Sequence, residues 1–370
     1  MNKDNLKNSS PIQKNTLSVF QIAVMTTISV ASLRTLPPMA EEGRASILMY
    51  IIPAILFLIP TSLVSAEFAT TYKGGVYVWI REAFGNRMGF VAIWLQWVQN
   101  VVWYPVQLAF VAAALAFTIN RGDLSNSGLF TAIVIIVVYW FSTFLAFKGG
   151  NLFAKVSSIG GMIGVLIPGA ILIILGLLWV AQGQPVSESY LQSSYIPKIT
   201  GISSLVLIVS NVLSYAGMEM NAVHAGQMEN PKKDFTKAIT LAFILILCVF
   251  IFPTLSISGR TGLLPPILQK KNKNNVQISI LIFQGIIVTI LAMIYVLFPN
   301  VSDVFIALIG MAAALYVVMY MLMFAAVIVL RKKEPNIERG YKVPAVNIVS
   351  GIGFISCALA FIMSFVPTTN

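Results

Sequence analysis

Long apolar runs alternate with short polar stretches along almost the whole chain. A helix that crosses a bilayer needs about 20 consecutive apolar residues, and runs of this length recur ten times. The pattern therefore predicts an all-α polytopic membrane protein with one spanning helix for each run. The predicted spans are 17–38, 46–68, 88–119, 128–147, 153–182, 202–224, 236–258, 276–298, 303–330 and 345–366.

The composition supports this prediction and excludes several classes of protein. Hydrophobic residues make up 58% of the 370 residues and charged residues only 10%, against about 25% charged residues in soluble domains. The net charge of +11 comes from Lys and Arg in short loops between apolar runs, so we expect no nucleic-acid partner. Cys248 and Cys357 lie in apolar runs and His224 is the only histidine, so we expect no disulfide, metal site or cofactor.

The loop charges predict a topology. Residues 1–16 are polar and basic, carry no signal-peptide pattern, and are expected to form a cytoplasmic tail. With this end inside, the loops after the second, fourth and sixth spans should be cytoplasmic, and they are the basic ones. Their cationic residues, counted together with the start of the following span, are Lys73, Arg81, Arg87, Lys148, Lys155, Lys232, Lys233 and Lys237.

The charge rule then fails for every later loop. The loop after the seventh span holds Arg260, Lys270 and Lys271, and the loop after the ninth holds a basic run from Arg331 to Lys342, yet both should be external. One missing span near 258–260 would restore the agreement. The sequence therefore predicts a second set of helices, 202–330, that is one helix short of the first set, 17–183, with an additional helix at 345–366.

Two predicted spans contain polar interruptions. The first has Ser29, Val30, Ala31, Ser32 and Arg34 before a proline pair, and the sixth combines Asn211, Ser214, Tyr215, Gly217, Glu219 and Asn221. Interrupted helices at matching places in two sets indicate the binding site of an inverted-repeat transporter. Broken backbone exposes helix ends, where an N-terminus attracts a carboxylate and a C-terminus attracts an ammonium.

Each of these polar residues also has a purely structural interpretation. Serine and threonine often serve only helix packing in membranes, and Arg34 can extend toward the outer interface. Glu219 is a carboxylate inside a span, a costly placement that favours a role in proton coupling, although a structural hydrogen-bonded carboxyl is the alternative. In the third span, Gln96, Gln99 and Asn100 can either line a cavity or join helices.

Two motifs resemble a known family. The first is Ala66-Glu67-Phe68-Ala69-Thr70 followed by Gly74-Gly75-Val76-Tyr77-Val78-Trp79, and the second is Ser214-Tyr215-Ala216-Gly217-Met218-Glu219 with Glu229-Asn230-Pro231. Together they resemble the amino acid–polyamine–organocation transporters, and most of all the bacterial glutamate/GABA antiporters. The resemblance extends over nearly the whole chain from about residue 16.

The resemblance implies a five-plus-five inverted-repeat fold, with substrate bound where the first and sixth helices unwind. Val30-Ala31-Ser32 stand at the place of the family's glycine-serine-glycine break, and Leu213 stands where related exchangers place an aromatic gate. It also implies that an eighth and a twelfth helix are missing. The implied substrate-binding residues are Ser29, Val30, Ala31, Ser32, Arg34, Gln99, Asn100, Tyr215 and Gly217, with Glu219 coupling protons.

These observations predict an amino acid transporter of the bacterial inner membrane, an antiporter for glutamate- or GABA-like substrates that works by alternating access. We expect no enzymatic activity, since the chain has no nucleophile–base pair, phosphate loop or metal cluster in its sequence. The expected partners are an amino acid and the lipid bilayer; the sequence does not indicate an oligomeric state. The alternative is an internally deleted paralogue that does not transport, or a membrane binding or sensing protein.

Overall fold

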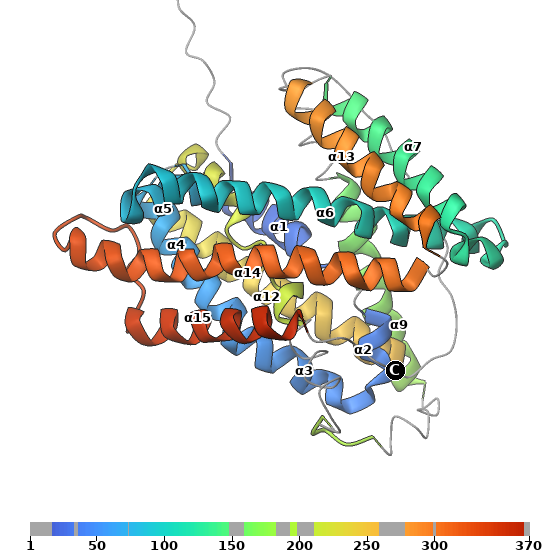
Figure 1. The fold of residues 1–370 in the computed structure, drawn as a ribbon. Helices are drawn as coiled ribbons and strands as arrows, with labels where there is room; N and C mark the ends of the chain where they lie inside the picture. The colour runs from blue at the N-terminus through green and yellow to red at the C-terminus, as the bar shows by residue number, and fades with distance from the viewer. Residues whose placement is uncertain are drawn as a thin grey trace, which may run out of the picture.

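The computed structural model describes residues 17–32, 36–72, 74–147, 159–182, 193–197, 211–258, 278–298 and 301–365, and every regular element in these ranges is a helix (Figure 1). Long helices form the body of the molecule, and short helices connect or interrupt them. The elements are α1 (Val19–Val30), α2 (Leu36–Glu41), η3 (Gly43–Ala45), α3 (Ser46–Pro53), η4 (Ala54–Leu58), α4 (Ile59–Thr71), α5 (Val76–Phe84), α6 (Asn86–Thr118), η5 (Gly122–Asn126), α7 (Gly128–Ala146), η6 (Met162–Leu166), α9 (Ile167–Ala181), η7 (Met220–Gln227), α12 (Pro231–Ser258), α13 (Ile278–Leu297), α14 (Val301–Lys333) and α15 (Val346–Met363).

The helices confirm the all-α polytopic fold. Within the described ranges, six are long and apolar enough to cross a membrane, and three shorter apolar helices accompany them. Nine of the ten predicted spans are matched in this way. The remaining one, the sixth predicted span at 202–224, is described only from Asn211. The long helices are Gly43–Thr71, Asn86–Thr118, Ile159–Trp179, Pro231–Phe252, Ala307–Lys333 and Val346–Met363, and the shorter ones are Val19–Val30, Gly128–Phe144 and Ile286–Leu297.

Helix α5 lies in what the hydropathy pattern presents only as a loop. Its buried residues Val76, Trp79, Ile80 and Ala83 recur every three or four positions, which is one face of a helix. Gly75, at φ 75°, precedes the helix in a conformation that favours glycine. The helix is amphipathic and only nine residues long, so it packs against the spanning helices and does not add a crossing.

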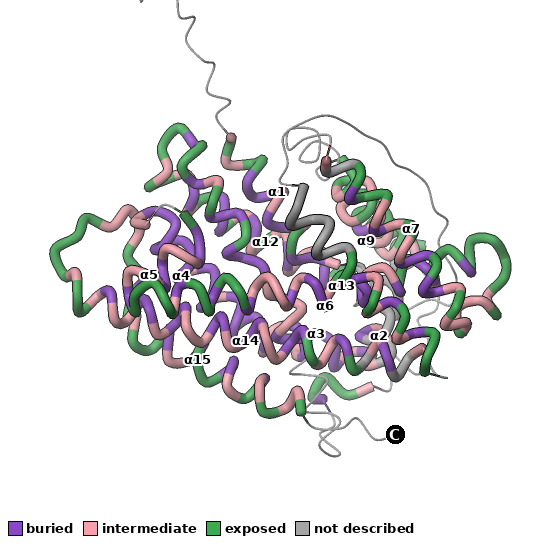
Figure 2. Tube along the Cα trace, turned by 45° about the horizontal axis from the view of Figure 1, so that its top comes forward, coloured by how far each residue is buried: buried purple, intermediate pink, exposed green. Residues whose placement is uncertain are grey.

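The core lies where the helices of the two halves of the sequence meet. Helix α1 packs against α12, and α14 packs against α6 and α15. Buried positions gather in the middle of this group, and exposed positions cover its outer faces (Figure 2). Phe57 of η4 and Tyr320 of α14 are both fully buried and meet edge to face, with ring centroids 4.9 Å apart.

One end of the molecule carries most of the basic side chains that the structure describes, and we call it the basic end. It comprises α5, the C-terminal end of α4, the start of α12, and the end of α14 with its following loop. Glu67 of α4 accepts hydrogen bonds from Arg331 of α14, and Tyr72 donates to Glu334 at 2.6 Å. Lys232 at the start of α12 pairs with Glu338 in the loop after α14.

These contacts place the loops after the second, sixth and ninth predicted spans at the same end. Helix α12 begins there and runs away from it. Helix α13 packs antiparallel to α7, because Trp140 donates to Thr289 at 2.9 Å, while Gly128, at the start of α7, packs against the backbone of Tyr295. Since α7 begins at the far end, α13 also ends at the far end (Figure 1).

Helices α12 and α13 therefore run in the same direction, although they follow each other along the chain. Two successive spans that run in the same direction break the usual alternation, and the loop charges predict one more crossing near 258–260, which stays a prediction.

Candidate functional site

The first break separates α1 from α2. Ser18 begins α1 with a capping box, in which its Oγ accepts from the Gln21 N–H at 3.2 Å and its own N–H donates to Gln21 at 2.9 Å. The helix ends at Val30, because Ala31 has extended backbone, and α2 begins only at Leu36. Ser29 donates its hydroxyl to the Met25 carbonyl at 2.9 Å, a bond to the preceding turn that bends helices.

The second break lies in the sixth predicted span. Residues from Asn211 to Ser214 are helical, the chain then turns, and η7 continues as a 3₁₀ helix from Met220. Gly217 forms the turn at φ 121°, a conformation that side chains rarely adopt. A Cβ added there would lie 3.3 Å from Val30 Cγ2 and 3.4 Å from the Ser29 carbonyl oxygen. Gly217 therefore brings the two breaks into direct contact.

Asn221 joins the two broken helices by hydrogen bonds. Its Nδ2 lies 3.3 Å from Thr26 Oγ1 and 3.3 Å from Ser29 Oγ. Asn221 and Thr26 are both buried, so these bonds satisfy polar groups that would otherwise lack partners inside the bundle.

Glu219 lies beside the breaks and is held by α14 and α6. It is 1% exposed, and its Oε1 accepts from the Tyr316 hydroxyl at 2.6 Å and from Gln96 Nε2 at 3.3 Å. Its Oε2 accepts from the Tyr320 hydroxyl at 2.5 Å. The Tyr320 oxygen in turn accepts the backbone N–H of Gly217 at 2.7 Å. A continuous hydrogen-bonded chain thus connects the backbone of the second break to the Glu219 carboxylate.

The remaining predicted site residues divide into three groups. Val30 and Ala31 are buried at the first break, with Ser32 beside them. Gln99 is buried on α6, and Asn100 donates to the Gln96 carbonyl of its own helix at 2.8 Å. Arg34 lies outside the described residues.

Tyr215 points away from the breaks. Its hydroxyl donates to the Tyr50 carbonyl of α3 at 3.1 Å, and its ring meets Phe250 of α12 edge to face at 5.3 Å. The structure therefore gives Tyr215 a packing position between α3 and α12, and does not bring it into the cluster around Glu219.

The sequence reasoning did not identify Tyr316 and Tyr320. They occupy adjacent turns on one face of α14, and both are largely buried. Their spacing of four residues is the only sequence signal, and it is common in any apolar helix. Their importance depends on Glu219, which is about one hundred residues earlier in the chain.

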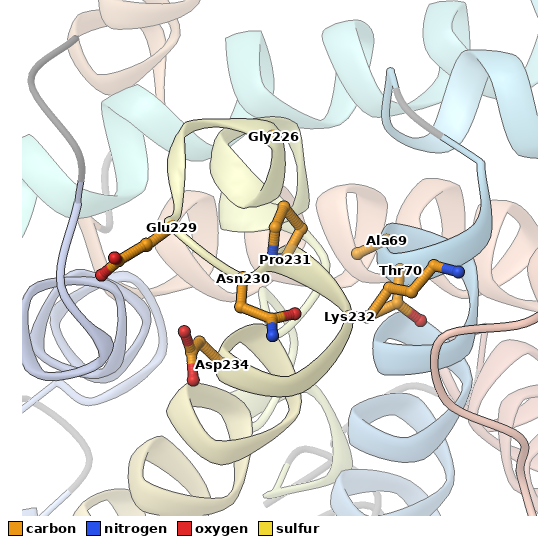
Figure 3. A pocket seen from close by; sticks show the side chains of 8 residues that line it. All are labelled: Ala69, Thr70, Gly226, Glu229, Asn230, Pro231, Lys232 and Asp234. Carbon is orange, nitrogen blue, oxygen red and sulfur yellow. The ribbon is translucent and has the colours of Figure 1, made fainter.

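A cavity of about 630 Å³ lies elsewhere, at the basic end (Figure 3). It separates the end of α4 from the start of α12, and none of its lining residues belongs to either break. Because Lys232, at the start of α12, lines it, the cavity belongs to the basic end, and neither Glu219 nor its tyrosine partners are among the lining residues. The lining residues are Ala69, Thr70, Gly226, Glu229, Asn230, Pro231, Lys232 and Asp234.

Comparison with known proteins identifies the family to which this fold and site belong. The sequence profile of the amino acid permease family matches residues 16–259 and 255–370. The chain belongs to the amino acid permease family. The permease match is divided into two stretches, which meet close to the position where the loop charges predict a missing crossing. This chain is thus a multi-pass membrane protein whose family comprises transporters and not enzymes.

Three relatives show how this permease compares in length. An uncharacterized transporter of Legionella pneumophila is 35% identical, with 96% of this chain and 91% of the relative covered. A glutamate/gamma-aminobutyrate antiporter of Lactococcus lactis is 26% identical over 96% of this chain and 84% of its own. A probable agmatine/putrescine antiporter of Lactococcus lactis is 25% identical over 89% and 83%. The first alignment runs over 423 positions, more than the 370 residues here, so the relative has residues that this permease lacks.

Proposed function

We propose that this permease binds a glutamate- or GABA-like amino acid at the paired breaks and exchanges it across the bacterial inner membrane. The observation that carries the proposal is the hydrogen-bonded chain from Gly217 through Tyr320 to Glu219. It joins the unwound backbone, where a substrate carboxylate would bind, to an ionisable side chain. The relatives that are antiporters of amino acids and polyamines support the same class of substrate.

The proposed topology places the N-terminus and the basic end in the cytoplasm. Residues 17–183 and 202–330 form the two inverted repeats, and 345–366 follows them. The first, second, sixth and seventh helices rock against the others during alternating access. The Ser29, Val30, Ala31 and Ser32 backbone faces the substrate, Arg34 meets an anionic side chain, and Gln99 and Asn100 face the site from α6.

Protonation of Glu219 changes the direction of the hydrogen bonds around it. The ionised carboxylate only accepts, and Tyr316, Tyr320 and Gln96 supply three donors. A protonated carboxyl donates through one oxygen, so the tyrosine bonded to that oxygen has to become the acceptor. When this tyrosine is Tyr320, its oxygen accepts from the carboxyl in place of the Gly217 N–H, and the freed N–H can bind a substrate carboxylate. This reversal is the proposed coupling between proton and amino acid.

A second candidate function follows from the missing crossing. The breaks and the Glu219 cluster require only helices that this chain has, whereas a sealed translocation pathway requires the whole bundle. A permease that keeps the binding site but lacks a sealed translocation pathway binds amino acids and does not exchange them. A membrane binding or sensing protein is the corresponding function.

Reconstituted vesicles distinguish the two functions. The purified full chain is placed in liposomes preloaded with unlabelled glutamate or GABA, and uptake of the labelled amino acid is followed over a range of pH. Exchange above the level of empty vesicles is the expected result. Putrescine serves as a competitor that tests the polyamine class. In parallel, equilibrium binding of the same labelled amino acids is measured in detergent.

Two variants make the result specific to the site. Glu219→Gln cannot change its protonation, so it should flatten the pH profile of exchange or of binding. Glu82→Gln removes a carboxylate at the basic end, where Glu82 pairs with Arg81 in partly exposed positions, and should leave the profile unchanged. Binding without exchange supports the second function. If the protein unfolds cooperatively but shows neither binding nor exchange, both proposed functions are contradicted.

A further inference from the structure

A groove of about 490 Å³ lies at the basic end, separate from the paired breaks. One wall is formed by the first turns of α12, and the other by the loop after α14. The groove begins with lysines and continues along threonine and aliphatic side chains. The lining residues are Lys232, Lys233, Thr236, Lys237, Thr240, Leu241, Ile244, Gly340 and Tyr341.

The residues of α12 in the groove form one stripe of the helix. Lys233, Lys237, Thr240 and Ile244 follow each other at spacings of three or four, and all four are exposed. The opposite side, which includes Phe235, is buried against the bundle. Because α12 is long and apolar enough to cross a membrane from Pro231, this stripe passes from charged groups at the interface to apolar groups in the bilayer.

The positive charge of the three lysines in the groove is only partly neutralised within the protein. Lys237 pairs with Asp234 at 3.0 Å, and Lys232 pairs with Glu338, whose side chain is 85% exposed. Lys233 has no ionic partner among the described residues. Three lysines against two carboxylates leave an excess of cationic charge, and the N-terminus of a long helix adds to it.

The second wall of the groove is held in place by close packing and a hydrogen bond. A Cβ added to Gly340 would lie 2.7 Å from Lys232 Cγ and 2.8 Å from Thr70 Cβ, so only glycine allows this approach. The next residue, Tyr341, donates its N–H to Thr70 Oγ1 at 3.0 Å. The loop therefore fixes the Lys232 side chain and gives the groove a defined shape.

We propose that this groove binds an anionic phospholipid from the leaflet at the basic end. The lipid phosphate lies on Lys233 and Lys237, and an acyl chain follows Thr240 and Ile244 toward the bilayer centre. Basic pockets at the membrane interface attract anionic headgroups in this way, and lysine stems extend naturally to that depth. A free phosphate shares the headgroup chemistry, but it has no acyl chain to contact Ile244.

Lipid binding to the purified full chain tests this proposal. Native mass spectrometry in detergent compares palmitoyl-oleoyl phosphatidylglycerol with phosphatidylcholine of the same chains, and inorganic phosphate is added as a competitor. The preference for phosphatidylglycerol should fall about 30-fold in a variant that combines Lys233→Gln and Lys237→Gln, since each interfacial lysine contributes about fivefold. Lys332→Gln, an exposed lysine outside the groove, is the matched control and should leave the preference unchanged.

A third variant separates lipid from free phosphate. Ile244→Asp places a charge under the acyl chain and should weaken phosphatidylglycerol binding while the lysines remain. An equal loss of the phosphatidylglycerol preference in the Lys332→Gln control would show diffuse attraction to the charged surface. Displacement of the lipid by millimolar phosphate, together with no effect of Ile244→Asp, would show a simple anion site. Either outcome overturns the proposal. All the substituted side chains are exposed, so the variants are expected to fold.

Discussion

The substitution Glu67→Gln tests whether the buried carboxylate of Glu67 stabilises the basic end. Its carboxylate is 1% exposed. One oxygen accepts from Arg331 at 2.7 Å and lies 3.1 Å from Arg339 Nε in an ion pair. The other accepts from Arg331 at 2.5 Å and from the Val343 N–H at 2.7 Å. Glutamine keeps the volume but leaves two guanidinium groups without a counter-charge. Removing one partner of a buried ion pair costs about 3–5 kcal/mol.

Thermal unfolding of the purified protein in detergent measures this loss. Glu67→Gln should lower the unfolding temperature far more than Glu82→Gln, because Glu82 and Arg81 are each more than a third exposed and exposed pairs are weak. Adding Arg331→Gln to Glu67→Gln should cost less than the sum of the two single changes, since it removes one of the two unpaired guanidinium groups. Equal small shifts for Glu67→Gln and Glu82→Gln would refute the role assigned to the cluster.

Two further predictions concern the paired breaks. Gly217→Ala forces a side chain into φ 121° and against Val30, and should destabilise the protein by about 1–3 kcal/mol in the same unfolding measurement; an unchanged unfolding temperature would contradict the strain. Tyr320→Phe removes the hydroxyl between Gly217 and Glu219 and leaves a buried N–H without its acceptor, at a cost of about 1–3 kcal/mol. It should also change the pH at which amino acid binding is half-maximal, whereas Tyr104→Phe, on α6 in a partly exposed position, should change neither.

The spanning helices could be predicted because their signal is local. An apolar run as long as 303–330 has few structures open to it in a bilayer, and α14 extends it by only a few residues at each end. The breaks were also predictable, since hydroxyl groups before a proline pair and a glycine near a carboxylate are rare in spanning helices. Helix α5 was missed because nine amphipathic residues in a polar stretch do not register as an apolar run.

The organisation of the site could not be predicted from the same patterns. Tyr316 and Tyr320 are two aromatic residues among many in an apolar helix, and only the packing of α14 places them on Glu219. Tyr215 shows the opposite case. It sits within the polar segment that carries Glu219, yet its side chain turns toward Tyr50, because the chain rotates at Gly217. Sequence proximity predicts a shared segment, whereas side-chain direction depends on the break itself.

Three observations bear on the predicted missing crossing. The loop charges predict it near 258–260, the successive helices α12 and α13 run in the same direction, and the family match is divided at 255–259. Under the proposed inverted repeat, the absent helix is the counterpart of α6, the helix whose Gln96 contacts Glu219. Its absence then removes a neighbour of α1 and leaves the neighbours of Glu219 in place. Substrate binding depends on the two breaks and on the Glu219 cluster, which this chain has. A sealed translocation pathway also depends on the helix that is predicted to be absent. Comparing binding with exchange therefore tests the effect of that absence.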